Sequence, residues 1–326
     1  MSSRFPFWLI PFAFFFPAVA DDSRNDSAAA LSPKLLEQTD PFQAALRALE
    51  DDLPSVAATK LDRIFREQKD DLTPSARDLL LRTWMEALAH AGRYGDVLQL
   101  SDRTFFQTSP DVVFWKGLAL GQTGDLRAAL KLLQPLARQK KTPYQASAAL
   151  TGSAFLLRMQ RPEAAIEILQ PLFRSETDPE TQALALLQAA EIHTDLARPE
   201  EAQALLRLIR EDTSPSIQRR LRFLEANTAL LMGDPETAVL RASELLTSLR
   251  QKDRNLANRT VFLLSEASAQ AGDQESAISV LQSFVLEQPT SDRLPEAFQR
   301  LEELGFFANR HVAVASWKTS SSPEVR

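Results

Sequence analysis

A helix-start signal recurs along this chain at nearly constant spacing, and this repeat constrains the fold more than any other feature. The signal is Ser, Thr or Asp followed by proline, and successive prolines lie 33, 36, 33, 36 and 36 residues apart. Ser, Thr and Asp cap the free amides at a helix N-terminus, and proline suits the first turn. Each signal opens an apolar-periodic stretch, so each predicts a helix. The copies are Asp40-Pro41, Thr73-Pro74, Ser109-Pro110, Thr142-Pro143, Asp178-Pro179 and Ser214-Pro215.

A second periodic feature lies about midway through each unit, after a short turn. Its positions are spaced 40, 32, 36, 37, 36 and 39 residues apart: Ala57, Val97, Ala129, Ala165, Ala202, Ala238 and Ala277. The positions twelve residues earlier are Ala45, Met85, Gly117, Ser153, Ala190, Ala226 and Ser265, six of which hold a small residue. Helix axes approach closely only where side chains are small. The two sets together predict seven helix-turn-helix units.

The composition excludes the main alternatives that contain β-sheet. Leu and Ala, which favour helices, are abundant, whereas Val and Ile, which favour strands, are few. A buried parallel sheet needs such β-branched residues. The 9 glycines are scattered and form no phosphate-binding loop. We therefore expect an all-α fold.

Several of the predicted turns resemble a known repeat. Gly124–Leu130 and Gly272–Ile278 are similar to the turn and second-helix start of tetratricopeptide repeats, and Arg198–Ala202 and Gly233–Ala238 follow the same pattern. The mean spacing here is about 37 residues, against 34 in the family. The resemblance covers residues 40–305 and implies a right-handed α-solenoid of about seven repeats. A related helical-hairpin subfamily stays open, because the family's aromatic residue near the start of the first helix is mostly missing.

The first twenty residues have the pattern of a secretory signal peptide. Arg4 precedes an apolar run from Phe5 to Phe16, and Ala18-Val19-Ala20 ends the segment. The run is shorter than the roughly 20 residues that a membrane-spanning helix needs, and prolines interrupt it. We expect cleavage after Ala20, with no membrane span remaining. Because the chain has no cysteine, it has neither disulfides nor a lipoprotein anchor, so we expect the bacterial periplasm or cell envelope.

Two segments flank the predicted solenoid. Residues 21–39 are expected to form a polar leader. Residues 306–326 contain apolar groups such as Trp317 and end in Ser322-Pro323-Glu324, a start signal after which no helix follows. We interpret this segment as a C-terminal partial repeat or a tail. As a partial repeat, it implies a front part of a longer repeat protein or end-to-end self-association.

We find no pattern that predicts catalysis, a cofactor or a metal site. The three histidines, His90, His193 and His311, are far apart, and no zinc-protease motif is present. Adjacent acidic pairs fall at predicted helix ends, where negative charge stabilises the N-terminal amides. The net charge of −6 argues against nucleic acid as the main partner. We predict a non-enzymatic protein; the helical accessory half of a larger envelope enzyme is the alternative.

The resemblance also implies a groove lined by the first helix of each unit. The candidate groove residues are Phe42, Arg82, Glu86, Phe114, Leu118, Leu150, Leu187, Glu191, Phe223, Asn227, Phe262 and Glu266. The family's carboxylate clamp uses Lys, Arg and Asn here, and only Arg82 and Asn227 match it. Two interpretations stay open: these apolar positions pack the solenoid, or they bind a partner's helix or extended segment. The sequence thus predicts a protein–protein interaction scaffold in the bacterial cell envelope, with unknown partners.

Overall fold

The structure, a computed structural model, describes residues 31–102, 109–140, 142–174, 177–249 and 253–305. Within these ranges every regular element is helical, apart from one isolated bridge between Leu31 and Leu72. No described helix combines the length and apolar character needed to cross a membrane. The predicted signal peptide, residues 21–30 of the predicted leader and the segment 306–326 lie outside the described residues.

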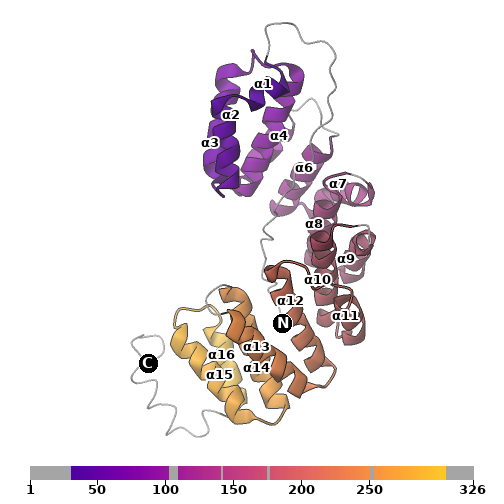
Figure 1. Cartoon of the computed structure of the whole chain (residues 1–326), viewed down its shortest axis with the longest axis vertical. Coiled ribbons are helices and arrows are strands. Elements are labelled where there is room, and N and C mark those ends of the chain that lie inside the picture. Colours follow the sequence, from indigo (N-terminus) through magenta and orange to yellow (C-terminus); the bar gives the residue numbers. More distant parts are fainter. Residues whose placement is uncertain (1–30, 103–108, 141, 175–176, 250–252, 306–326) are drawn as a thin grey trace. The chain divides into compact units, whose positions relative to one another are not determined.

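Consecutive helices form seven hairpins (Figure 1). The pairs are α2 (Asp40–Glu50) with α3 (Pro54–Gln68), α4 (Pro74–His90) with α5 (Tyr94–Ser101), α6 (Pro110–Gln122) with α7 (Leu126–Arg138), α8 (Gln145–Arg158) with α9 (Pro162–Leu169), α10 (Pro179–Asp195) with α11 (Pro199–Leu206), α12 (Pro215–Leu231) with α13 (Pro235–Leu249), and α14 (Arg254–Gln270) with α15 (Gln274–Glu287). A short α1 (Pro33–Glu37) precedes them, η1 (Gln170–Phe173) extends α9, and α16 (Leu294–Glu303) follows them. The prediction of seven helix-turn-helix units is confirmed.

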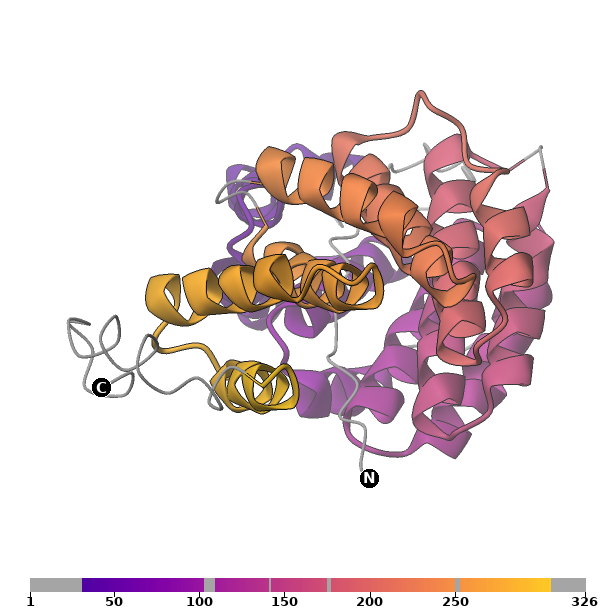
Figure 2. The same cartoon turned by 90° about the horizontal axis from the view of Figure 1, so that it is seen from below.

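The helices divide into two compact units, residues 1–148 and 149–326, which we call unit 1 and unit 2. Unit 1 contains α1 to α7, unit 2 contains α9 to α16, and the boundary falls inside α8. In unit 2, one apolar core runs from α10 to α14 and a second core joins α14, α15 and α16. Figure 2 shows these last helices, in orange to yellow, from a second direction.

The predicted small positions lie where the two helices of each hairpin cross. All seven second-helix positions, from Ala57 to Ala277, have an exposed fraction of 0%. In the last hairpin, the Ser265 hydroxyl donates a hydrogen bond to the Ala277 carbonyl at 3.0 Å, which places the two sets directly against each other. In α6, a Cβ added at Gly117 would lie 2.8 Å from the Leu133 side chain. Close packing at these crossings therefore requires the small residues that the repeat supplies.

Most first helices of the hairpins begin where the start signals predict. Five of the six signals lie at the observed helix start; α8 begins at Gln145, two residues after Pro143. The Thr73 hydroxyl accepts a hydrogen bond from the Ala76 amide at 3.2 Å, and the Asp178 carboxylate accepts one from the Thr181 amide at 3.0 Å. Such bonds satisfy amides that have no partner within the helix.

Every hairpin turns through a residue with positive φ. In α10–α11 this residue is Ala197, at φ 54°. The next amide, of Arg198, donates to the His193 carbonyl at 2.9 Å, and the Ala197 amide donates to the Thr194 carbonyl at 3.0 Å. These two bonds define a Schellman motif, which ends a helix with one left-handed residue. The corresponding residues are Asp52, Gly92, Gly124, Gln160, Ala197, Gly233 and Gly272.

We predict that Ala197→Gly stabilises unit 2, whereas Gly233→Ala destabilises it. A left-handed conformation costs a non-glycine residue roughly 1–2 kcal/mol. Glycine avoids this cost but also raises the conformational entropy of the unfolded chain, which offsets part of the gain. The expected net change is therefore about 0.5–1 kcal/mol in each direction. Thermal and urea unfolding followed by circular dichroism measure it. If Ala197→Gly lowers the unfolding midpoint, the left-handed turn carries no such cost.

Candidate functional site

The twelve candidate groove residues all lie on the first helices of their hairpins, and they differ in exposure. Five apolar members are buried: Phe42, Phe114, Leu150, Leu187 and Phe223. The others are partly exposed: Arg82, Glu86, Leu118, Glu191, Asn227, Phe262 and Glu266. Phe42, Arg82, Glu86, Phe114 and Leu118 belong to unit 1, and the remaining seven belong to unit 2.

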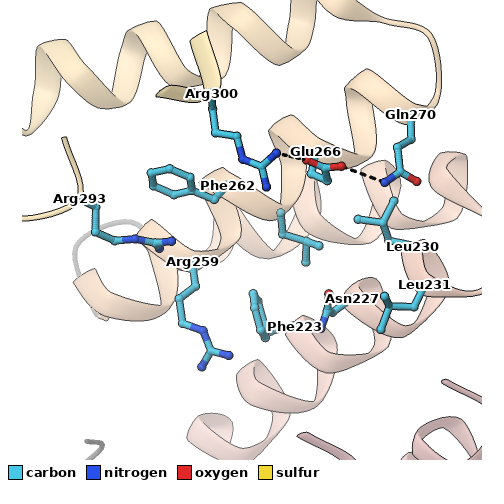
Figure 3. A pocket seen from close by; sticks show the side chains of 11 residues that line it. Phe223, Asn227, Leu230, Leu231, Arg259, Phe262, Glu266, Gln270, Arg293 and Arg300 are labelled. Atoms are coloured by element: carbon cyan, nitrogen blue, oxygen red, sulfur yellow. Dashed lines mark hydrogen bonds and ion pairs between the residues drawn. The ribbon is translucent and has the colours of Figure 1, made fainter. Parts of the chain in front are cut away.

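Four of the candidates meet at one pocket in unit 2 (Figure 3). The pocket has a volume of about 400 Å³ and lies between α12, α14 and α16. The first helices of two successive hairpins, α12 and α14, thus form one site together with α16. The predicted lining residues are Phe223, Asn227, Phe262 and Glu266; the others are Leu230, Leu231, Arg259, Leu263, Gln270, Arg293 and Arg300.

Two arginines stack on the two aromatic rings of the pocket. The Arg293 guanidinium lies 3.9 Å from the centre of the Phe262 ring, and the Arg259 guanidinium lies 4.5 Å from the centre of the Phe223 ring. A cation over an aromatic face is attracted by the ring's quadrupole. Arg293 is also held by Glu296, which accepts from its Nε and Nη2 at 2.9 Å each. The guanidinium groups are therefore oriented before any ligand arrives.

Two carboxylates position the other polar groups. Glu266 pairs with Nη1 of Arg300 at 3.1 Å and accepts a hydrogen bond from Gln270 at 3.0 Å (Figure 3). Glu191, on α10, does not line the pocket; it pairs with Arg259 at 2.8 Å and with Arg220 at 3.6 Å. Glu191 thus acts on the pocket through Arg259.

A different cluster occupies the first-helix face of unit 1. Arg82 lies between Asp78 and Asp111, with an N–O distance of 2.8 Å to each. One turn along α4, the Glu86 side chain is only 14% exposed. Burial, together with the negative charge of Asp111, raises the pKa of Glu86 from 4.5 to about 7. Burial also raises the pKa of Tyr144.

Aromatic rings pack beside this cluster. Phe114 contacts Trp115 with ring centres 4.8 Å apart and stacks on Tyr144 with centres 5.2 Å apart. Phe114 thus packs against two aromatic rings, and Arg82 forms two ion pairs within the protein. In unit 1 the packing interpretation therefore describes these positions better than a groove does.

The unit 2 pocket has a mixed aromatic, aliphatic and charged lining. Across the described ranges, no three His, Cys, Asp or Glu side chains gather in a way that could hold a metal ion. The unit 2 pocket instead offers aromatic and aliphatic surface next to guanidinium donors, which suits non-covalent recognition.

We predict that the stability of unit 1 decreases as the pH rises from about 4.5 to about 7 and that Glu86→Gln removes much of this decrease. Because the folded state holds the Glu86 proton more tightly than the unfolded state, deprotonation above the unfolded pKa favours unfolding. The expected effect is on the order of 2–3 kcal/mol. Unfolding midpoints between pH 4.5 and pH 8 measure it, with Glu67→Gln on exposed α3 surface as the control. Parallel pH profiles for all three proteins would contradict the assignment.

Comparisons with known proteins give the fold. No protein-family model and no curated protein matches this sequence. Among solved structures, a tetratricopeptide repeat protein from Parabacteroides merdae is 12% identical, with a TM-score of 0.53, and the match covers 81% of this chain and 97% of that one. The apo form of the quorum sensor NprR from B. thuringiensis is 14% identical, with a TM-score of 0.58, and the match covers 87% of this chain and 89% of that one.

These similarities extend over most of the chain and agree with the seven hairpins described above. The all-α prediction and the resemblance that the turns suggested are confirmed at the level of the fold. This chain has the fold of tetratricopeptide repeat proteins, an α-solenoid of helical hairpins.

Proposed function

We propose that this protein is a non-enzymatic interaction scaffold and that the unit 2 pocket binds a segment of a partner protein. The observation that carries the proposal is the meeting of Phe223, Phe262 and three arginines at one pocket between α12, α14 and α16. Aromatic and arginine side chains in a partly closed pocket are typical anchors of protein–protein binding. The fold shared with a tetratricopeptide repeat protein supports the same role.

Exposed apolar surface beside the pocket supports binding. Leu231, which lines the pocket, and Met232, which follows it, are each 44% exposed. Apolar side chains gathered next to a pocket indicate an interaction site more strongly than scattered ones do. A partner segment that covered them would gain roughly 25 cal/mol for each Å² of apolar surface removed from water.

We place this scaffold in the bacterial cell envelope. The support is the pattern of residues 1–20, with a basic start, an apolar centre and Ala18-Val19-Ala20 before the expected cut. The absence of cysteine from a chain of 326 residues fits export without disulfides.

Two phenylalanine substitutions, one in the pocket and one on a second helix, test whether the pocket binds the partner. We predict that Phe262→Ser weakens partner capture from envelope extract at least about tenfold, because it removes an anchor ring. Phe65→Ser, which changes a partly exposed phenylalanine on α3, should leave capture unchanged. Quantitative pull-down with crosslinking, together with thermal unfolding of each variant, measures both effects. Equal capture by the two variants would remove the pocket from the function.

Phe223 needs separate treatment because it is both a pocket residue and a member of the core. Its exposed fraction is 6%, and it packs within the apolar cluster from α10 to α14. Phe223→Ser should therefore lower the free energy of unfolding by roughly 3–5 kcal/mol, as for other emptied aromatic core sites. For this reason Phe262 is the better probe of binding.

The N-terminus of the purified protein tests whether the signal peptide is removed on export. We predict that the form recovered from the periplasm begins at Asp21, because Ala18-Val19-Ala20 provides the small residues that signal peptidases require. Intact-mass spectrometry measures the cleavage, and a form that still begins at Met1 would refute it. Hydrolysis of peptidoglycan or peptides by the purified protein would favour the enzyme alternative instead.

A further inference from the structure

A second, smaller pocket adjoins the unit 2 pocket at the C-terminal end of α16. It has a volume of about 190 Å³, and it shares Phe262, Glu266 and Arg300 with the unit 2 pocket (Figure 3). We call it the α16 pocket; its other lining residues are Ser265, Ala269, Glu303 and Leu304. Because three residues line both pockets, a single segment of chain can contact both.

The chain leaves the described structure at the wall of the α16 pocket. Leu304, which lines this pocket, follows the last residue of α16, and Gly305 is the last described residue. Gly305 has a φ of 71°, and its amide donates to the Glu302 carbonyl at 2.9 Å. A left-handed residue of this kind ends a helix. The residues that follow are therefore tethered beside the α16 pocket.

The helix before this point leaves little apolar surface for the segment that follows it. Its buried residues Leu294, Ala297 and Leu301 already pack in the core with α14 and α15. The exposed residues of α16 are polar except for one proline: Pro295, Glu296, Gln299, Arg300, Glu302 and Glu303. A polar outer face suits the end of a solenoid, because it needs no further helix to cover it.

The sequence after Gly305 also lacks the small residue that closes a hairpin. In all seven hairpins the buried second-helix position lies five residues after the left-handed residue, as Ala277 does after Gly272. Five residues after Gly305 stands Arg310, and the position twelve residues before it holds Phe298. Helix axes approach closely only where side chains are small. Residues 306–326 therefore do not match an eighth hairpin.

Residues 306–326 nevertheless contain large apolar side chains. Phe306 and Phe307 come first, and Trp317 follows. Aromatic groups of this size gain free energy when an apolar surface within reach removes them from water. The two pockets offer such a surface, since Phe262 is partly exposed and Leu231 is 44% exposed.

We propose that residues 306–326 fold back along α14 and occupy both pockets. The two phenylalanines contact Phe262 in the α16 pocket, and Trp317 covers Leu231 in the unit 2 pocket. A short tether gives a local concentration on the order of millimolar, so even a weak contact forms in most molecules. A partner segment must then displace this part of the chain before it binds. The competition rests on the proposed function, whereas the contact itself does not.

A fluorescently labelled peptide with the sequence of residues 306–318 tests the contact by anisotropy on the full chain from Asp21. A tail variant of that chain carries Phe306→Ser, Phe307→Ser and Trp317→Ser, so its own segment no longer competes for the pockets. We expect the peptide to bind the tail variant at least about tenfold more tightly than the unchanged chain, because the tether favours the attached segment.

Two further substitutions in the tail variant locate the site. Phe262→Ser should weaken peptide binding at least about tenfold, because Phe262 lines both pockets. Phe65→Ser, on α3 of unit 1, is the matched control and should leave peptide binding unchanged. Circular dichroism confirms that each variant folds. A peptide that binds the unchanged chain and the tail variant equally, or that ignores Phe262→Ser, would overturn the proposal.

Partner capture separates this inference from the proposed function. The tail variant should capture roughly 3–10-fold more partner from envelope extract than the unchanged chain does. If the peptide needs Phe262 but the tail variant captures no more partner, the contact stands and the competition is wrong. If capture depends on Phe262 while the peptide does not bind the tail variant, the scaffold function stands and this inference is wrong.

Sedimentation of the unchanged chain and of the tail variant distinguishes contact within one chain from contact between two copies. We expect both to be monomers. If the unchanged chain is a dimer and the tail variant is a monomer, the segment occupies the pockets of a second copy, and the fold-back within one chain is wrong.

Discussion

The close crossing of two helices at small residues is the contact on which the rest of this structure depends. In the last hairpin, the fully buried second-helix residue Ala277 meets the small first-helix residue Ser265, and six of the seven hairpins have a small residue at the same first-helix position. The Schellman turn then returns the chain at a fixed angle. Because successive hairpins repeat this geometry, the first helices α12 and α14, together with α16, present side chains to one pocket.

The hairpin fold could be predicted from the sequence because it depends on local features. These are small residues at the helix crossings and capping residues at the helix starts. The crossings, five helix starts and the four glycine turns were all visible as spacing. The left-handed residues Asp52, Gln160 and Ala197 were not, since Gln and Ala side chains do not favour positive φ and an Asp has many other uses at helix ends. The turn at Ala197 was located by the Arg198–Ala202 pattern that follows it, but its left-handed conformation was not predicted.

The candidate site was only partly predictable. Counting back from each second-helix alanine found Phe223 and Phe262, but the same count cannot reach α16, which has no following second helix among the described residues. Arg293 and Arg300 were therefore missed, although they supply much of the pocket's charge. Sequence spacing also could not separate the buried rings, such as Phe114, from the partly exposed Phe262, because burial depends on which neighbours close over each position.

Glu191 links hairpins that are not direct neighbours along the chain. In a repeat protein each hairpin normally senses only its direct neighbours, so a disturbance fades within one step. Here a single carboxylate on α10 joins Arg220 on α12 and Arg259 on α14, which is a second-neighbour coupling. The ion pairs of Glu191 therefore connect α10 with both α12 and α14, beyond the packing of each hairpin on its direct neighbour.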